Sequence, residues 1–203
     1  MSQDQVPGVA FSSAAERNRH PILEQLSILL PENCTVLEIG SGTGQHAVFF
    51  SQHLSGVQWQ PSDREENIRC LEARFVEEGN PQILPALKLD VITGEWPQHF
   101  YTAAYSANTA HIMSWKAVEA MFRGIADCLQ KDAKFFLYGP FNMNGQYTSE
   151  SNARFDRQLQ LNSPEMGIRD VEAIEALARV HNMYLDRKIP MPANNYLLVF
   201  IRI

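Results

Sequence analysis

The sequence predicts an α/β fold: a seven-stranded, mostly parallel sheet with an antiparallel last strand and helices on both faces. Strand-like and helix-like segments alternate along the 203 residues, as in proteins whose helices pack on a parallel sheet. A glycine-rich turn directly follows the first strand, as in many parallel sheets that bind ligands. The last two strands are separated only by residues 190–195, too few for a parallel crossover. This length suits one well-filled domain, residues 1–203.

The first half of the sheet is predicted from apolar, β-favouring runs separated by helical periodicity. Predicted strands lie at residues 35–39, 57–60 and 83–89, the last one weakened by Pro85. A helix over residues 44–53 follows the first strand, and a helix carrying Ile68, Leu71 and Phe75 follows the second strand. Gly79-Asn80-Pro81 should end that second helix.

The second half continues the alternation and adds a polar insertion. Predicted strands lie at residues 101–107, 134–138, 183–189 and 196–203. Apolar residues at helical spacing predict helices at residues 118–129 and 171–178, and a short helix is expected near residues 151–161. Residues 141–164 are otherwise polar, and a connection of this length in a compact domain is usually functional or mobile.

The segment before the first strand is expected to form a turn and then a helix. Ser13-Ala14-Ala15-Glu16 matches a capping box, and Pro21 stands where a helix would begin, so the helix is expected over residues 21–30. Between them lie Arg17-Asn18-Arg19-His20. These residues form either a solvated charged turn or a polar lid, and residues 1–30 are expected to act as an N-terminal lid and helix.

Composition disfavours several classes of protein. The net charge is −6 and there is no basic stripe, which disfavours a nucleic-acid partner. No stretch approaches the roughly 20 apolar residues of a membrane span, and the first ten residues lack an export signal, so we expect a cytoplasmic protein without membrane attachment. Cys34, Cys70 and Cys128 are far apart and have no metal-ligand spacing, so no metal is expected.

The turn after the first strand has the spacing of a ligand loop. Glu38-Ile39-Gly40-Ser41-Gly42-Thr43-Gly44 places three glycines where backbone must approach a ligand closely. Gln45 stands where a dinucleotide fingerprint has its third glycine. The E-x-G-x-G-x-G form resembles motif I of class I methyltransferases. That resemblance implies a loop wrapped around the methionine and ribose parts of S-adenosylmethionine.

Acidic residues follow the next two strands at positions suited to the same ligand. Asp63 lies 19 residues after Gly44, close to the spacing of a ribose-binding carboxylate. Glu65 and Glu66 are competitors, although acidic residues in a first helical turn often merely complement the helix dipole. Asp90, after the third strand, is either an ordinary turn residue or, by resemblance to these methyltransferases, a partner of the adenine amino group, with Val91 beside the ring.

A further resemblance covers nearly the whole chain. The motifs that carry it are Ala15-Glu16-Arg17-Asn18, Pro21-Ile22-Leu23, residues 38–44, Tyr138-Gly139-Pro140-Phe141, Phe155-Asp156, Gly167-Ile168-Arg169-Asp170 and Met191-Pro192-Ala193-Asn194-Asn195. They resemble the methyltransferase-like family known as domain of unknown function 938. Arg19-His20 departs from the more acidic, lysine-containing pair expected there.

This resemblance implies a Rossmann-like methyltransferase fold that binds S-adenosyl-L-methionine, without naming a methyl acceptor. The expected cofactor-binding residues are Arg17, Asn18, Glu38, Gly40, Ser41, Gly42, Gly44, Asp63, Asp90, Val91 and Asn108.

Few residues can be named for catalysis, because methyl transfer from a sulfonium mainly needs the reactants held in line. Candidates near the expected methyl group are Asn108, His111, Tyr138 and Asn142. His111 is either a general base or a histidine that packs at the start of a helix. Tyr138 and Phe141 either box an acceptor or pack the sheet end. Residues 141–164 are expected to form an acceptor-side lid.

Three functions remain open from sequence alone. The first is a methyltransferase acting by in-line transfer on a small-molecule or protein acceptor. The second is a catalytically silent relative that binds the cofactor or a partner. The third, a nicotinamide-dependent oxidoreductase, is disfavoured by Gln45 at the third glycine position and by the terminal hairpin. Oligomeric state is not predicted.

Overall fold

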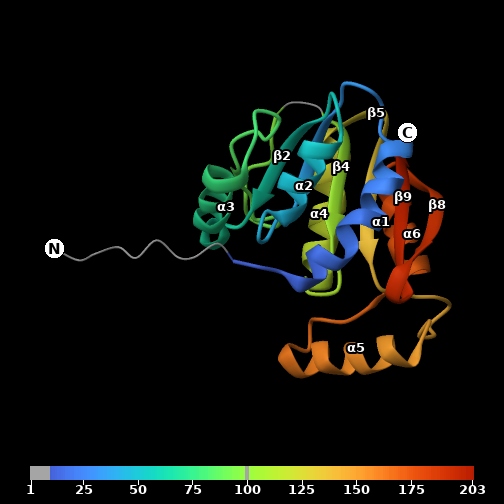
Figure 1. Ribbon diagram of the computed structural model, residues 1–203. Coiled ribbons are helices and arrows are strands. Elements are labelled where there is room, and N and C mark those ends of the chain that lie inside the picture. The colour runs from blue at the N-terminus through green and yellow to red at the C-terminus, as the bar shows by residue number, and fades with distance from the viewer. Residues whose placement is uncertain (1–9, 99–100) are drawn as a thin grey trace. The chain divides into compact units, whose positions relative to one another are not determined.

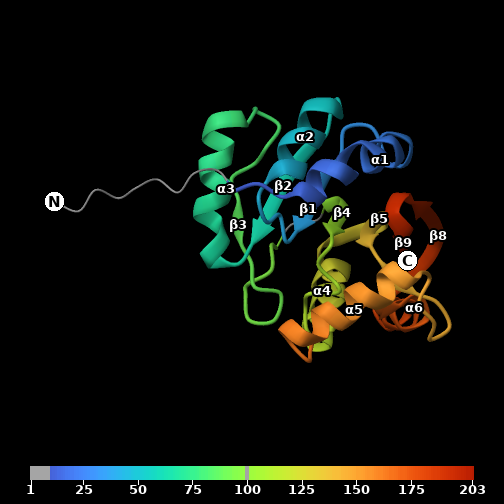
Figure 2. The ribbon, with the colours of Figure 1, turned by 60° about the horizontal axis from the view of Figure 1, so that its bottom comes forward.

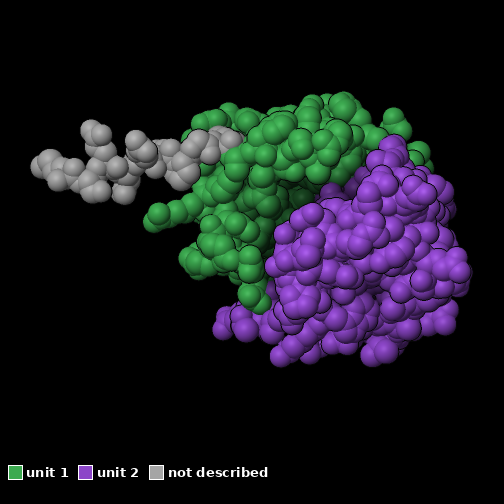
Figure 3. Space-filling view, turned by 90° about the horizontal axis from the view of Figure 1, so that it is seen from below, with its two compact units in different colours: residues 1–90 green, residues 91–203 purple. Residues whose placement is uncertain are grey.

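The computed structural model describes residues 10–98 and 101–203. The chain divides into two compact units, residues 1–90 and 91–203, which Figure 3 colours separately. Within the described residues there are six α-helices and a main sheet of seven strands (Figure 1). No helix in these ranges is long and apolar enough to cross a membrane.

Unit 1 is built from alternating helices and parallel strands. Its elements are α1 (Ser13–Leu29), β1 (Thr35–Ile39), α2 (Gln45–His53), β2 (Gln58–Asp63), α3 (Glu65–Glu78) and β3 (Leu87–Lys88). The strands run parallel in the order β3-β2-β1, with Val36 opposite Trp59 and Ser62 opposite Leu87. β1 is buried over Val36–Ile39, as expected for a parallel strand covered by helices.

Unit 2 carries the reversed strand. Its elements are β4 (Tyr101–Ala107), α4 (Trp115–Cys128), β5 (Leu129–Gly139), β6 (Phe141–Asn142), α5 (Glu150–Asn162), β7 (Arg169–Asp170), α6 (Val171–Val180), β8 (Met183–Met191), a 3-10 turn (Pro192–Asn194) and β9 (Asn195–Arg202). The order is β4-β5-β9-β8, and β9 is antiparallel to both neighbours. β6 and β7 form a separate parallel pair. Figure 2 shows β9 between β5 and β8.

Aromatic packing holds the centre of unit 2 together. Phe122 of α4 contacts Phe135 of β5 and Phe200 of β9 edge to face, with ring centroids 5.3 and 5.5 Å apart. All three rings are fully buried, and such pairs add about 0.5–1.5 kcal/mol each beyond the burial of their area. The terminal hairpin is therefore fastened to β5 through its side chains as well as its backbone.

The expected fold class is confirmed, including the antiparallel last strand and the hairpin formed by β8 and β9. The structure also moves some boundaries. β5 begins at Leu129, which was expected to close the preceding helix, and β2 runs on through Pro61 to Asp63.

The N-terminal prediction was wrong in two respects. α1 is one continuous helix with Pro21 inside it, and its N-cap is Ser12, whose Oγ accepts a hydrogen bond from Ala15 N at 3.2 Å. Proline removes a single helical hydrogen bond, to the carbonyl of exposed Arg17, which water can reach. The helix continues past Pro21 because one face is buried on both sides of it, at Asn18, Ile22, Leu26 and Leu29.

The third strand is also much shorter than expected. Only Leu87 and Lys88 form a ladder, preceded by an isolated bridge between Ile83 and Trp59. Pro85 has no N–H to donate, and its carbonyl accepts a hydrogen bond from the side-chain amide of Gln60 at 2.6 Å. The backbone between the bridge and the strand therefore leaves the regular ladder.

Candidate functional site

The glycine loop connects β1 to α2 in a strongly curved path. Gly40, Gly42 and Gly44 have φ values of 73°, 56° and 73°, a region that side chains make unfavourable. The Gly40 and Ser41 N–H groups both donate to the carbonyl of Ser62 in β2, each at 3.0 Å. The loop is therefore anchored to the end of the neighbouring strand.

Gly42 and Gly44 have different surroundings. A Cβ placed on Gly42 would meet no atom within 4 Å, so the loop faces open space there. A Cβ on Gly44 would lie 3.0 Å from the Phe75 ring and 3.1 Å from the Leu71 side chain, both on α3. Gly44 thus permits close packing of loop and helix, whereas Gly42 leaves room for a ligand beside the backbone.

Asp63, at the end of β2, is bound to this loop. Its Oδ2 accepts a hydrogen bond from Gly42 N at 2.7 Å. Its Oδ1 accepts hydrogen bonds from Arg64 N and Asn67 Nδ2, both at 2.8 Å. A carboxylate offers about four acceptor positions, so one position on Oδ2 remains for a further donor. The two sequence markers, glycine loop and acidic residue, lie in direct contact.

Glu38 is buried beneath the loop. Its Oε2 accepts hydrogen bonds from Ser41 Oγ at 2.8 Å and from Trp59 Nε1 at 2.9 Å. Burial raises the pKa of Glu38 from 4.5 to about 7, and the two hydrogen bonds oppose this rise. Through these contacts Glu38 links Ser41 of the loop to Trp59 of β2 and so stabilises the loop.

Arg17 and Asn18 lie in the first half of α1. Arg17 is exposed, whereas Asn18 is buried and its Oδ1 lies 2.7 Å from His46 Nε2 on α2. Burial lowers the pKa of His46 from 6.5 to about 4, so its ring is uncharged at neutral pH. His46, which sequence reasoning did not single out, ties α1 to the helix that follows the loop.

Asp90 and Val91 follow β3. The Leu89 N–H donates to the carbonyl of Asp63 at 2.8 Å, which continues the pairing with β2 by one residue. Asp90 is half-buried and Val91 is buried.

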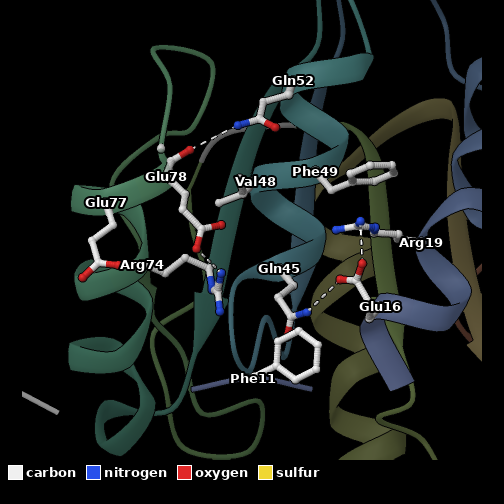
Figure 4. Close-up of a pocket in the computed structure, with 11 residues that line it drawn as sticks. Phe11, Glu16, Arg19, Gln45, Val48, Phe49, Gln52, Arg74, Glu77 and Glu78 are labelled. Carbon is white, nitrogen blue, oxygen red and sulfur yellow. Dashed lines mark hydrogen bonds and ion pairs between the residues drawn. The ribbon is translucent and has the colours of Figure 1, made fainter. Parts of the chain in front are cut away.

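Unit 1 also has a cavity of about 660 Å³ that is not lined by the glycine loop or by Asp63 (Figure 4). Phe11, Arg19 and Phe49 line it together with residues of α3, and none of the expected cofactor-binding residues does. Of its two arginines, Arg74 donates to two backbone carbonyls and to Glu78. Arg19 pairs with Glu16 and lies over the Phe49 ring, but its buried Nε has no hydrogen-bond partner among the described residues.

In unit 2, Asn108 and His111 lie next to the end of β5. Asn108 has a φ of 57°, and its N–H donates to the carbonyl of Tyr138 at 2.9 Å. A Cβ placed on Gly139 would lie 3.7 Å from His111 Nδ1 and 3.9 Å from Asn108 Oδ1. The two polar side chains therefore converge over a position where no side chain stands.

The protonation of His111 bears on its chemistry. The side chain is buried, and burial together with the nearby Arg169 guanidinium lowers its pKa from 6.5 to about 4. At neutral pH the ring is uncharged and can accept a proton, but a base this weak removes protons poorly. His111 is therefore better suited to hydrogen bonding than to strong base catalysis.

Tyr138 and Asn142 differ in their surroundings. Tyr138 is buried at the end of β5. Asn142 donates from Nδ2 to the carbonyl of Ile168 at 3.5 Å, and its buried Oδ1 has no hydrogen-bond partner within the described part of the chain. An unpaired buried acceptor is unfavourable by about 1–3 kcal/mol, so a donor from a bound molecule would be favoured there.

Two residues of unit 2 were missed by sequence reasoning as site residues, although both stand in the motifs that carried the family resemblance. Asp156 of α5 accepts hydrogen bonds from Tyr147 Oη and Gln160 Nε2 on Oδ2, at 2.7 and 2.9 Å, and from Ile168 N on Oδ1 at 2.6 Å. Arg169 donates to the carbonyl of Ala110 at 3.1 Å, one residue before His111. Their spacing in sequence could not show what they contact.

Comparison with known proteins agrees with this architecture. The family model "Protein of unknown function (DUF938)" matches residues 9–202, so the chain belongs to that family. The fold it shares with solved structures is that of class I methyltransferases.

Three solved structures illustrate the likeness. Mitomycin 7-O-methyltransferase MmcR is 14% identical with a TM-score of 0.80, and the match covers 94% of this chain and 55% of that one. Human N-acetylserotonin methyltransferase in complex with SAM is 12% identical with a TM-score of 0.79, and the match covers 93% of this chain and 52% of that one. CalO1, a methyltransferase in calicheamicin biosynthesis in its SAH-bound form, is 15% identical with a TM-score of 0.74, and the match covers 94% of this chain and 55% of that one. This chain spans about half the length of these proteins.

Within the described ranges, no group of three or more His, Cys, Asp or Glu residues is arranged to hold a metal ion.

Proposed function

We propose that this protein is a methyltransferase that uses S-adenosyl-L-methionine and acts on a small-molecule or protein acceptor. The observation that carries the proposal is the contact between Gly42 N and Asp63 Oδ2 beside open space. A left-handed glycine with room next to it and a carboxylate with one acceptor position left suit the ribose end of the donor. The methyltransferases that share the fold, two of them solved with SAM or SAH, support this choice of donor.

In this proposal unit 1 supplies most of the donor contacts. The loop backbone at Gly40, Ser41 and Gly42 follows the methionine and ribose parts, and Asp63 accepts a ribose hydroxyl. Asp90 accepts from the adenine amino group, and Val91 packs beside the ring. Glu38 and Gly44 contribute by shaping the loop, since their side-chain positions face Trp59 and α3. Arg17, Asn18 and Asn108 complete the proposed set.

The bound donor supplies an activated methyl group on a positively charged sulfur. The protein's task is then to orient the acceptor and exclude water. We assign orientation to Asn108 and His111, which converge over Gly139, and to the unpaired Oδ1 of Asn142. Tyr138 remains a candidate through its place at the end of β5. An acceptor that must lose its proton would need a stronger base than His111.

We further propose that residues 1–30, of which 1–9 lie outside the described residues, and residues 141–164 act as lids, the second on the acceptor side. Support for the second comes from α5, which places the half-exposed Phe155 ring edge-on to His111 with centroids 5.2 Å apart. Limited proteolysis tests both: cofactor should protect bonds in these segments, and an unchanged cleavage pattern would count against a lid.

Calorimetry with S-adenosylmethionine and S-adenosylhomocysteine tests the donor assignment. Asp63→Asn should weaken binding by about 1–3 kcal/mol, the scale of a hydrogen bond to a charged group. The matched control is Glu66→Gln, which should bind the donor like the parent. Glu66 is an exposed carboxylate three residues from Asp63, and among the described residues it pairs only with Arg64. Equal affinity of parent and folded Asp63→Asn would refute the ribose assignment.

Incubation of cell extract with methyl-labelled donor separates an active enzyme from a silent relative. A labelled product that depends on the protein supports turnover. Binding of the donor without any product would favour the alternative, a catalytically silent protein that binds the cofactor or a partner.

A further inference from the structure

The Arg169 guanidinium contacts the turn that carries His111. Its Nε donates to the carbonyl of Ala110 at 3.1 Å, and its Nη2 donates to the carbonyl of Met113 at 2.5 Å and to that of Glu165 at 2.8 Å. Ala110 and Met113 stand on either side of His111 in the chain. Because the donors of a guanidinium form a rigid planar fork, these bonds fix the spacing of the two carbonyls.

The residues just before Arg169 make a second contact with the turn that carries His111. Gly167 N donates to the carbonyl of His111 at 2.9 Å, and Ile168 N donates to Asp156 Oδ1 at 2.6 Å. A Cβ on Gly167 would lie 3.2 Å from that Oδ1, so glycine lets the segment pass close to α5. Residues 167–169 thus bind the His111 turn on one side and α5 on the other.

The His111 ring is bounded on two sides by the same arrangement. Phe155, the residue before Asp156, meets the ring edge to face at 5.2 Å. Gly139 lies against Nδ1 without a side chain. The orientation of the ring therefore depends on where the turn from Ala110 to Met113 is held.

We propose that Arg169 is a positioning residue that holds the turn of residues 110–113, so that the His111 side chain stays beside Asn108 over Gly139. The inference rests on the proposed function only in that these two side chains are expected to orient the acceptor. Lysine cannot replace Arg169 in this role, since one ammonium cannot bridge the carbonyls of Ala110 and Met113 with a fixed geometry.

Amide hydrogen exchange of the full chain measures the position of the turn directly. The Ile112 and Met113 N–H groups both donate to the carbonyl of Thr109 at 3.0 Å. In Arg169→Lys these two amides should exchange at least roughly tenfold faster, because a charged hydrogen bond that stabilises the turn is lost. Amides of the β4–β5 ladder serve as internal reference and should be unchanged.

The titration of His111, followed by NMR, gives a second readout that a merely structural role would not move. In Arg169→Gln the pKa of His111 should rise above about 4, because the neighbouring cation is removed, but it should stay below 6.5, because burial, the larger cause, remains.

Arg202→Gln is the matched control, since Arg202 also donates to backbone carbonyls, those of Ala126, Asn182 and Ile203, but away from the turn. It should leave both readouts unchanged. Unchanged exchange in Arg169→Lys, or equal acceleration in Arg202→Gln, would overturn the proposal.

Donor binding by the same variants separates this inference from the proposed function. If the parent protein fails to bind S-adenosylmethionine while Arg169→Lys loosens the turn, the positioning role stands and the proposed function fails. If the donor binds and neither readout moves, the positioning role alone is wrong.

Discussion

Replacing Glu38 by glutamine should remove a pH dependence of stability that the structure builds into the glycine loop. Glu38 is only 2% exposed and accepts hydrogen bonds from Ser41 and Trp59. Burial raises its pKa from 4.5 to about 7. Glutamine has nearly the same shape, and its carbonyl oxygen can accept both hydrogen bonds without a charge.

The magnitude follows from the shift in pKa. The folded state holds this proton more tightly than the unfolded state between pH 4.5 and 7, so the stabilisation is complete below pH 4.5 and is lost as the pH rises through 7. A shift of 7 − 4.5 = 2.5 units corresponds to about 3 kcal/mol. The free energy of unfolding of Glu38→Gln minus that of the parent should therefore increase by about 3 kcal/mol as the pH rises from 4.5 to 8.

Urea denaturation of both proteins at pH 4.5, 6, 7 and 8 measures this difference. Subtracting one protein from the other cancels the titration of groups they share. Glu77→Gln removes an exposed carboxylate from the same unit and should change stability little at each pH. A difference between Glu38→Gln and parent that stays constant from pH 4.5 to 8 would refute the reasoning.

Three further predictions concern unit 1. Gly44→Ala should lower the free energy of unfolding by about 2–4 kcal/mol, since strain at a φ of 73° adds to crowding against α3, whereas Gly42→Ala should lower it by only about 1–2 kcal/mol and mainly weaken donor binding. Denaturation and calorimetry of the pair check this, and the reverse ranking would contradict it. His46 has its pKa lowered to about 4, so the unfolded chain binds its proton first and stability is lost as the pH falls from 6.5 to 4; His46→Gln should remove up to about 3 kcal/mol of that loss, measured by denaturation at both pH values. Pro21→Ala should raise the stability of α1 by about 1–3 kcal/mol by restoring a hydrogen bond to the Arg17 carbonyl, and a lower melting temperature would show that the proline is required.

Much of unit 1 could be predicted because its signals are local. The strand over residues 35–39 and the helix that follows the glycine loop lie where their patterns placed them. The spacing of 19 residues between Gly44 and Asp63 predicted that loop and carboxylate serve one site, and their markers meet at Gly42. Parallel neighbours make this possible, since consecutive strands end at the same edge of the sheet.

The failures arose where distant packing outweighed local preference. Pro21 predicts a helix start, yet the buried stripe at Ile22, Leu26 and Leu29 extends the helix on both sides of it. Ile83–Leu89 has strand-like composition, but Pro85 and its contact with Gln60 withdraw most of it from the ladder. A proline inside a helix costs about 3 kcal/mol, whereas the burial of each large apolar side chain contributes about 1.5–3 kcal/mol, so three buried side chains outweigh one proline.

The α/β class, the family motifs and the glycine loop with its acidic partner could be predicted from the residues alone, because periodicity and turn chemistry depend on near neighbours in the chain. Other features depend on long-range packing: β9 lies between β5 and β8, Glu38 accepts a hydrogen bond from Trp59, and Arg169 contacts the turn of His111 across 56 and 59 residues of sequence. Such contacts form between segments that folding brings together, and their hydrogen bonds and pKa shifts follow from burial, which no local pattern specifies.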